Sequence, residues 1–286
     1  MYPFNTTSKC GVVVVLYYPT LNAIEDIISS INEYNIYLID NTPENDIKYS
    51  LYNFDNTSYI KNKENKGIAF AQNIGIKRAL NDGCEYVAFF DQDSLLSEDL
   101  IDKLIQEYNR IEKSEYKIGV LGPLPINLDN NQPYKQRVLK KIDDLEIFIT
   151  DMVISSGMLV KSFVFERVGL MDEDLFIDGV DFEFCWRLQE AGFKCFVTYK
   201  IKLLHKVGKD DTSFMGFPII ISSPIRYYYM YRNYFKLAFR NYVPLSWKLK
   251  NLVKRVFFLF YALTLDDRKN IYRNILKGVL DGFSKK

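Results

Sequence analysis

The chain has 286 residues, of which 48% are hydrophobic and 26% are charged, and its net charge is +1. This length suffices for one large domain, or for one domain with a sizeable appendage. No segment is of low complexity and no internal repeat is found, which excludes a repeat architecture. The longest apolar stretch, residues 256–265, has 10 residues. A membrane-spanning helix needs about 20.

The small net charge hides an uneven distribution. Residues 224–286 contain 14 Lys or Arg and only 3 Asp, so the rest of the chain carries a net negative charge. Such asymmetry predicts a basic tail that meets an anionic surface. The alternative is a basic helical face that docks on the acidic body of the same protein.

The cysteines and the N-terminus both indicate a cytoplasmic protein. Cys10, Cys84, Cys185 and Cys195 form no C-x-x-C pair and lie in apolar or helical contexts, so we expect reduced core residues. The first nine residues lack a basic region followed by an apolar run, so no secretory signal is predicted.

Buried strands and amphipathic helices alternate along the first 120 residues. The strands are predicted from the apolar runs GVVVVLYY, IYLIDN, EYVAFFDQDS and KIGVLGP, and helical spacing of apolar residues recurs between them. This alternation predicts an α/β domain with a mainly parallel sheet flanked by helices.

Polar side chains follow three of these strands where each one ends. They are Tyr17 with Tyr18, Asp40 with Asn41, and Asp91 with Gln92 and Asp93. Ligands of such sheets bind outside the carboxyl ends of the strands, so we expect the three clusters to share one edge.

The second half of the chain is less regular. A strand, a turn and a short helix are expected over residues 147–169, then an acidic segment that becomes a helix ending at Gly192. From Pro224 onward the pattern is helical. We therefore expect a domain over residues 1–223 and a basic helical extension over residues 224–286, which binds a membrane or a second subunit.

Asp91 and Asp93 stand one residue apart at the end of a buried strand, where they would repel each other. Two such carboxylates can hold Mg²⁺ or Mn²⁺, which completes its coordination with substrate phosphates. The cation would then stabilise a departing diphosphate. The alternative is that Asp93 or Ser94 caps a helix that begins near Ser97.

A second acidic group surrounds the start of the later helix. Asp178, Asp181 and Glu183 precede or enter it, and the i,i+4 spacing of Glu183 and Arg187 predicts an ion pair. A carboxylate at Asp181 could serve as a general base toward a hydroxyl group. The alternative is an acidic cluster that the helix dipole stabilises.

Two further features fit either structure or function. His205 is the sole histidine, and it is either structural or a third metal ligand from a later strand. The segment around Asn65, Gly67 and Asn73 does not match a P-loop or a dinucleotide fingerprint. Asn73 either ties strand ends together or helps to organise a nucleotide site.

Together these pieces resemble glycosyltransferase family 2, an inverting group with the GT-A fold. The resemblance is carried, in order along the chain, by the stretches VVVVLYYP, LIDN, NKGIAFAQNIGI, FFDQDS, SSGMLV, DEDLFIDGVDFEFCWR, LLHKVG and RYYYMYRN. The resemblance extends from about Gly11 to Gly282. FFDQDS, FIDGVDFEFCWR and YYYMYRN look most like bacterial rhamnosyltransferases, which use dTDP-β-L-rhamnose to build surface polysaccharides. The chain departs from the family at Leu16 and Tyr18, where Thr and Asn are usual, and at Val180, where an acid is frequent.

The resemblance implies roles for particular residues. Asp181 would be the catalytic base, and Asp91, Asp93 and His205 would contact the metal. Donor binding would involve Tyr17, Asp40, Asn65, Gly67, Asn73, Asp91, Gln92 and Asp93, and the acceptor side would be supported by Gly157, Asp178, Glu183, Arg187 and Arg226.

The implied reaction moves L-rhamnose from the nucleotide sugar to a hydroxyl group of a lipid-linked or polysaccharide acceptor. The same residues would also suit UDP-galactofuranose, a UDP-hexose, or hydrolysis without an acceptor. A non-catalytic nucleotide-sugar binding protein is disfavoured by the complete set of acids. A nucleic-acid binder would leave the acidic strand ends unexplained.

The basic, aromatic tail suits a helix that lies on an anionic membrane, where a lipid-linked acceptor would also be found. We therefore expect a peripheral protein on the inner face of the cell membrane. The alternative is ordinary helix packing, including a homodimer interface.

Overall fold

The computed structural model of the protein describes residues 10–43, 56–134, 136–142, 146–205, 211–214, 217–220 and 222–284. The chain divides into two compact units. The first runs to Phe176 and continues over Val180–Lys206, and the second consists of Ile177–Gly179 and the residues from Val207 onward. The second unit therefore includes residues 224–286, for which a separate extension is predicted.

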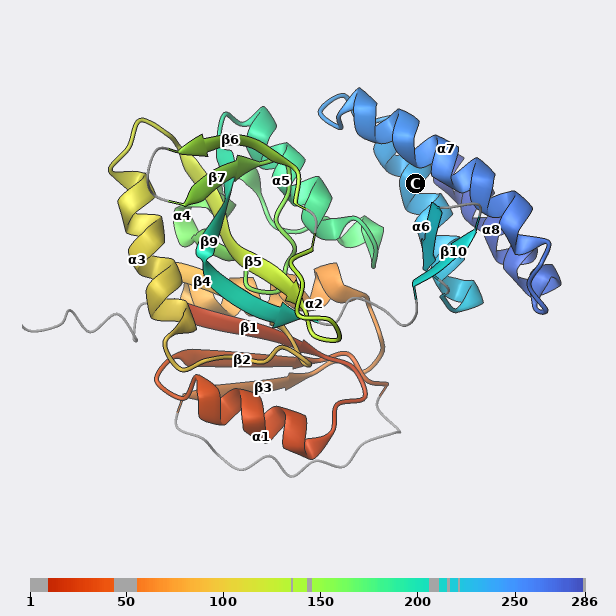
Figure 1. Ribbon diagram of the computed structural model, residues 1–286. Coiled ribbons are helices and arrows are strands. Elements are labelled where there is room, and N and C mark those ends of the chain that lie inside the picture. The colour runs from red at the N-terminus through yellow and green to blue at the C-terminus, as the bar shows by residue number, and fades with distance from the viewer. Residues whose placement is uncertain are drawn as a thin grey trace, which may run out of the picture. The chain divides into compact units, whose positions relative to one another are not determined.

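Within the described residues, the first unit is built on a nine-stranded sheet in the order β3-β2-β1-β4-β8-β5-β9-β7-β6 (Figure 1). The strands are β1 (Cys10–Leu16), β2 (Asn35–Asp40), β3 (Thr57–Lys61), β4 (Tyr86–Asp91), β5 (Ile118–Asn127), β6 (Val138–Ile142), β7 (Ile147–Thr150), β8 (Leu159–Lys161) and β9 (Lys194–His205).

The sheet is parallel from β3 through β4 and mixed beyond that point. β1 pairs in parallel with β2 and β4, and β2 with β3. The short strand β8 then runs antiparallel to both β4 and β5, while β5 and β9 are again parallel. The predicted parallel arrangement therefore describes the first four strands, which are the ones that end in polar residues.

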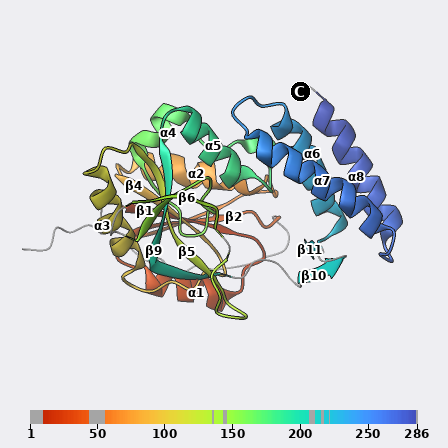
Figure 2. The ribbon, with the colours of Figure 1, turned by 45° about the horizontal axis from the view of Figure 1, so that its top comes forward.

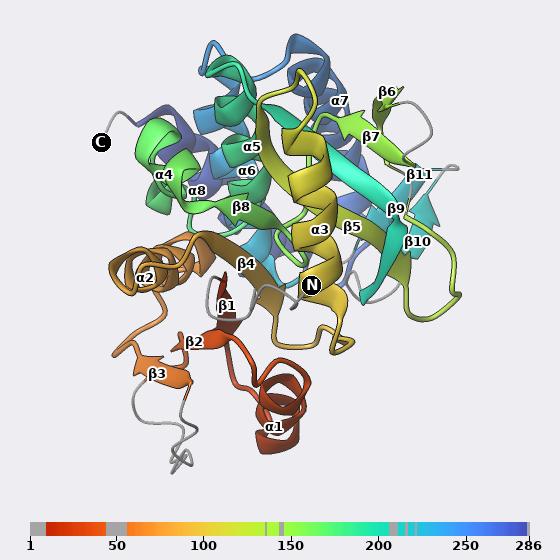
Figure 3. The same ribbon diagram turned by 90° about the vertical axis from the view of Figure 1, so that its left-hand side faces the viewer.

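Helices cover both faces of this sheet, as predicted. They are α1 (Leu21–Ser30), α2 (Ile68–Asn81), α3 (Leu100–Glu112), α4 (Ser162–Val168) and α5 (Val180–Glu190), with a 3-10 turn at Glu173–Leu175. Ile24 of α1 and Leu104 of α3 share a core with Val14 of β1. α2 packs on the opposite face, where Gly75 leaves room for Val13 of β1 (Figure 3).

The second unit is mainly helical, as the pattern from Pro224 onward predicts. It contains the strands β10 (Asp211–Phe214) and β11 (Phe217–Ile220), and the helices α6 (Pro224–Ala238), α7 (Leu245–Ala262) and α8 (Arg268–Phe283), which lie side by side (Figure 2). A Cβ atom added at Gly278 of α8 would lie 2.3 Å from the carbonyl oxygen of Tyr228 in α6. The glycine therefore permits the close approach of these two helices.

The four cysteines are buried and free, as expected for reduced core residues. Burial, and next the neighbouring Cys84, raises the pKa of the Cys10 thiol far above its usual range. In the part of the chain that the structure describes, no helix is both long enough and apolar enough to cross a membrane.

Candidate active site

The three predicted polar clusters lie at one edge of the sheet. Because β1, β2 and β4 are parallel, their carboxyl ends point the same way. Leu16 is paired with Asp40, and Val15 with Asp91, so the ends of the three strands are aligned across the sheet. The predicted convergence of these segments is confirmed.

The side chain of Asp40, at the end of β2, is fully buried and satisfied within the protein. Its Oδ1 accepts a hydrogen bond of 2.8 Å from the backbone N–H of Thr42, and its Oδ2 accepts one of 2.5 Å from the hydroxyl of Tyr59. Next to it, Asn41 donates to the carbonyl oxygen of Gly67 and accepts from Asn62. This strand end is a closed hydrogen-bonded corner.

Gln92, between the two acids, connects the end of β4 to the end of β1. Its Oε1 accepts the backbone N–H of Tyr17 at 2.7 Å, and its Nε2 donates to the carbonyl oxygen of the same residue at 3.1 Å. The rings of Tyr17 and Tyr18 meet edge to face, and both are about half exposed. The glutamine thus fixes the backbone beside an exposed aromatic pair, which can stack against a planar base.

The turn that carries Asp91 and Asp93 is held by serines that the sequence analysis did not assign to the site. The backbone N–H of Asp91 donates to the hydroxyl of Ser94, and that hydroxyl lies 2.8 Å from the hydroxyl of Ser156. The helix α3 begins only at Leu100, with Asp99 as its N-cap. The alternative that Asp93 or Ser94 caps a helix near Ser97 is therefore wrong.

Gly157 links the segment after β7 to the same strand. Its backbone N–H donates to the carbonyl oxygen of Phe89 in β4 at 2.7 Å. It has a φ of 83°, and a Cβ atom there would lie 2.6 Å from Pro123. Both the backbone conformation and the space require glycine, so its role toward an acceptor would be to shape the backbone.

Asp181 lies in the first turn of α5 and is partly buried. Loss of solvation raises the pKa of its carboxyl group to about 6; backbone N–H groups, including those of Phe182 and Ser155, oppose the rise, and the negative charge of Asp91 adds to it. Phe182 donates its backbone N–H to Oδ1 at 3.0 Å. A carboxyl group whose pKa lies near neutrality is suited to proton transfer.

The predicted ion pair between Glu183 and Arg187 is present and is part of the frame of α5. Glu183 is 1% exposed, and both of its carboxylate oxygens accept hydrogen bonds of 2.8 Å from Arg187. The guanidinium group also donates to the carbonyl oxygens of Val168 and Leu170. The pair thereby connects α5, which carries Asp181, to the end of α4.

The segment of Asn65, Gly67 and Asn73 makes contacts with its own protein. Asn65 accepts the backbone N–H of Gly67, which has a φ of 89° and no room for a Cβ atom beside Phe176. Asn73 is 2% exposed and binds both the N–H and the carbonyl oxygen of Met171, as well as Glu173. Any role of Asn73 toward a donor would therefore act through the loop around Met171.

Asp178 belongs to the second unit, where it pairs with Arg226. Both hydrogen bonds from the guanidinium group, at 2.9 and 3.3 Å, fall on Oδ1 of the carboxylate. The other oxygen, Oδ2, is buried without a hydrogen-bond partner in the described structure. Asn233, which sequence analysis missed, donates to the carbonyl oxygens of Ile177 and Asp178 and so supports the left-handed conformation of Asp178.

No group of three or more His, Cys, Asp or Glu side chains within the described residues is arranged to hold a metal ion. His205 is the last residue of β9, opposite Asn127 of β5, and its side chain lies outside the described part of the structure. A cation that takes most of its ligands from water and phosphates needs only one or two carboxylates. Asp91, partly buried, and Asp93, exposed at the sheet edge, fit that requirement.

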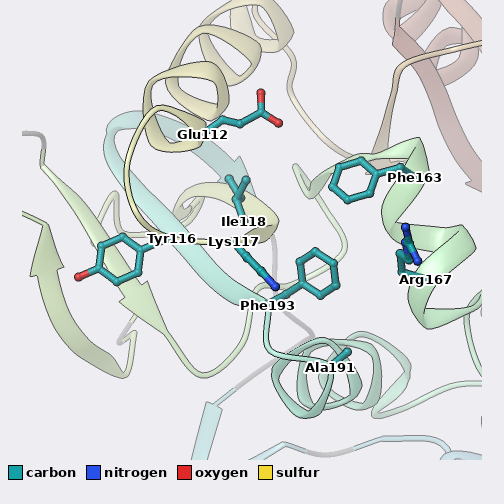
Figure 4. A pocket seen from close by; sticks show the side chains of 8 residues that line it. All are labelled: Glu112, Tyr116, Lys117, Ile118, Phe163, Arg167, Ala191 and Phe193. Atoms are coloured by element: carbon teal, nitrogen blue, oxygen red, sulfur yellow. The ribbon is translucent and has the colours of Figure 1, made fainter.

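A separate cavity of about 590 Å³ lies at the opposite edge of the sheet, where β5 begins (Figure 4). Its walls include the rings of Tyr116, Phe163 and Phe193, and the cations Lys117 and Arg167. It contains none of the predicted site residues.

A helix-flanked sheet with an Asp-x-Asp turn and a partly buried carboxyl group of raised pKa near its carboxyl edge defines the class of GT-A glycosyltransferases. The profile of "Glycosyl transferase family 2" matches residues 13–169. A dTDP-rhamnosyl transferase from Shigella flexneri, RfbF, is 35% identical over 284 residues, which are 96% of this chain and 94% of that protein. The chain belongs to glycosyl transferase family 2, so it is a glycosyltransferase.

Solved structures support the fold. GalNAc-T7, determined with UDP, GalNAc and Mn²⁺, aligns with a TM-score of 0.57 and 18% identity, covering 85% of this chain and 54% of that one. S. aureus TarS residues 1–349, determined with UDP-GlcNAc, aligns with a TM-score of 0.58 and 13% identity, covering 96% of this chain and 80% of that one. The predicted GT-A fold is confirmed.

Proposed function

We propose that the protein transfers L-rhamnose from dTDP-β-L-rhamnose to a hydroxyl group of a lipid-linked or polysaccharide acceptor in the synthesis of a bacterial surface glycan. The observation that carries this proposal is the carboxyl group of Asp181, with its raised pKa, near Asp91 at the carboxyl edge of the sheet. The donor is inferred from the full-length similarity to a dTDP-rhamnosyl transferase.

In the proposed reaction, Asp181 acts as the general base. Its ionised carboxylate accepts the proton of the acceptor hydroxyl group as the oxygen attacks the anomeric carbon of the sugar. The bond from that carbon to the diphosphate oxygen breaks, and the nucleoside diphosphate leaves with the bonding electrons. Attack opposite to the leaving group inverts the configuration. A positioned base contributes about 10²–10⁴-fold to such a reaction.

Asp91 and Asp93 are proposed to hold Mg²⁺ or Mn²⁺, with His205 as a candidate third ligand. A bound cation of this kind stabilises the negative charge that collects on a departing diphosphate. Asp91 also raises the pKa of Asp181 through the repulsion of their charges. A substitution of Asp91 would therefore also change the pKa of the proposed base.

The remaining donor contacts are proposed from the strand ends. Tyr17, exposed and fixed by Gln92, would face the nucleobase. Asp40, with both oxygens occupied, would border the base by keeping this corner closed. Asn65, Gly67 and Asn73 would shape the pocket through the loops that they hold.

The acceptor side is proposed to be shaped by Gly157 and by the pairs Glu183–Arg187 and Asp178–Arg226. In the second pair, Oδ2 of Asp178 is buried and accepts no hydrogen bond in the described structure. Such an oxygen is a candidate acceptor for a sugar hydroxyl group. We further propose that the protein works at the inner face of the cell membrane, where a lipid-linked acceptor would be anchored.

A thermal stabilisation screen tests the donor. The purified protein is melted with dTDP-rhamnose, dTDP-glucose, UDP-glucose, UDP-galactofuranose and UDP-GlcNAc, each with and without Mn²⁺. We expect the largest increase in Tm with dTDP-rhamnose in the presence of Mn²⁺, since a ligand that binds only the folded state stabilises it. A larger increase with a UDP-sugar would overturn the donor assignment, and no increase with any nucleotide sugar would overturn the proposed function.

A further inference from the structure

The helix α7 has two faces of different character. Its inner face is attached to α6: Arg255 donates to the carbonyl oxygen of Met230 at 2.8 Å, and the hydroxyl of Tyr231 donates to the carbonyl oxygen of Arg255 at 2.7 Å. Ala262 is fully buried on the same side. The position of α7 within its unit is therefore fixed by these contacts.

The outer face of α7 is apolar and uncovered. Six side chains at helical spacing are 41–67% exposed, and together they are called the apolar stripe: Leu245, Leu249, Leu252, Val253, Val256 and Phe260. With 3.6 residues per turn they fall within an arc of about 100°. The stripe runs from Leu245 to Phe260 and therefore extends for about 23 Å along α7. Soluble monomers rarely expose a continuous apolar surface of this kind unless it binds something.

The charges beside the apolar stripe are all positive. α7 contains Lys248, Lys250, Lys254 and Arg255 and no acidic residue. Lys250 and Lys254 are both exposed. At 100° per residue, Lys250 lies about 60° from Val253 at the edge of the stripe, whereas Lys254 lies on the side of the helix away from the stripe. Desolvation, followed by the positive charges of Lys250 and Arg255, lowers the pKa of Lys254. An anionic surface would relieve this crowding of like charges.

We propose that α7 lies flat in the interface of an anionic lipid bilayer, with the apolar stripe among the upper acyl chains and with Lys250 against the lipid phosphates. An apolar arc flanked by lysines is the pattern of a helix that lies in the plane of the membrane surface. The proposal rests on the proposed function only in giving a lipid-linked acceptor a reason to be nearby.

The charge pattern favours a bilayer over a second copy of the chain. A twofold pairing of two α7 helices would place their lysines near each other, and the helix offers no acid to balance them. Phospholipid headgroups of negative charge supply that balance along the whole helix, at roughly fivefold in binding per lysine.

Vesicle flotation tests the proposal with the full chain. The protein is mixed with vesicles of phosphatidylglycerol and phosphatidylcholine, or of phosphatidylcholine alone, at low and at high salt. We expect flotation with the anionic vesicles at low salt and at least tenfold less with neutral ones. The double variant Val253→Asp with Phe260→Asp should lose at least tenfold in binding to anionic vesicles, and Lys250→Ser should lose roughly fivefold.

A matched control changes equally exposed apolar residues on another helix. Leu276 and Leu280 of α8 are 61% and 63% exposed, against 67% and 62% for Val253 and Phe260. The variant Leu276→Asp with Leu280→Asp should float like the unchanged protein. Equal loss in the two variants would overturn the assignment to α7, as would flotation of Val253→Asp with Phe260→Asp at the unchanged level.

Two measurements separate the remaining outcomes. Light scattering gives the oligomeric state: a dimer that the α7 variant alone dissociates, with no vesicle binding in either, would overturn the proposal in favour of a second copy. Stabilisation by a nucleotide sugar reports on the catalytic unit. A protein that floats normally without responding to any nucleotide sugar would refute the proposed function and leave the role of α7 supported.

Discussion

The ends of β2 and β4 are on either side of β1, and each is a buried strand that finishes in an aspartate. At the end of β2, both oxygens of Asp40 accept hydrogen bonds from within the protein, and none of the side chain is exposed. β4 itself ends at Asp91, and two residues further on Asp93 is exposed, with no hydrogen bond or ion pair to its side chain among the described residues. An apolar strand followed by an aspartate thus has two different outcomes in this protein. After β2 the carboxylate is buried and hydrogen-bonded within the fold, and after β4 a carboxylate is exposed to a ligand.

The difference comes from the partners that the chain brings to each end. Thr42 and Tyr59 close the first corner, whereas the turn after β4 uses Ser94 and Gln92 to fix the backbone and leaves the carboxylate of Asp93 outward. A strand-end acid is therefore a candidate for chemistry only when its oxygens are not already used by the fold.

The largest expected effect lies at Asp181. Replacing it with Asn keeps the shape of the side chain and removes the base, so transfer should fall by about 10²–10⁴-fold. Donor binding, measured by thermal stabilisation with dTDP-rhamnose, should stay within a few-fold of the unchanged protein. Loss of donor binding together with activity would contradict the assignment of Asp181 as the base.

The variant Asp93→Asn tests whether the exposed carboxylate that follows β4 takes part in the reaction. We expect kcat/KM to fall by about 10²-fold or more, since a group that stabilises developing charge is lost. The Mn²⁺-dependent part of donor stabilisation should also disappear. Asp40→Asn is the matched control at the other strand end, and an equal loss of activity there, in a folded protein, would erase the distinction between the two acids.

The pH dependence of transfer should report the raised pKa of Asp181. The base must be ionised, so kcat/KM should be level above about pH 6 and fall tenfold per unit below it. A profile measured from pH 4.5 to 8.5 that stays flat through pH 6 would show that another group controls the reaction.

The same raised pKa makes a prediction about stability. A carboxyl group whose folded pKa lies above its unfolded value of 3.8 destabilises the fold when ionised, and this penalty is absent at pH values below 3.8. Asp181→Asn should therefore raise the free energy of unfolding at pH 8, by up to about 3 kcal/mol, and the gain should shrink toward pH 4. Urea unfolding at the two pH values measures it.

The smallest effect on catalysis is expected at the closed corner. Asp40→Asn should cost about 1–3 kcal/mol in the free energy of unfolding, because Tyr59 or Thr42 loses its charged acceptor. The activity of the folded fraction should change only a few-fold. Tyr59→Phe removes one of the two hydrogen bonds and should cost less. Urea unfolding monitored by fluorescence compares the two, and a greater loss in the tyrosine variant would contradict this account.

Much of the fold could be predicted because its signals are local. The run of valines in β1 has no polar side to expose, and the helical spacing in α1 and α3 defines one buried face each. The alignment of Tyr17, Asp40 and Asp91 followed from the parallel order of their strands. The antiparallel β8 could not be predicted in this way, since its three residues are too few to show a period.

The contacts within the site were less predictable because they join distant parts of the chain. Gln92 binds Tyr17 across 75 residues, and Asn73 binds Met171 across 98. The local sequence around Gln92 or Asn73 does not predict which residue its side-chain amide binds. The outer face of α7 was hidden for another reason: apolar residues occur all around that helix, and only the structure shows that Arg255 turns inward while Val253 stays exposed.

The glycines of α8 limit how the chain can be shortened. Gly278 and Gly282 bring α8 against the backbone of α6, and Ile271 and Ile275 share a core with Tyr227 and Tyr231. Cutting the chain before residue 268 would bare those tyrosines to water. If such a shortened protein failed to bind membranes, the cause could be the disrupted packing of α6 and not the loss of a binding surface. Surface substitutions in the full-length chain therefore test membrane binding more directly.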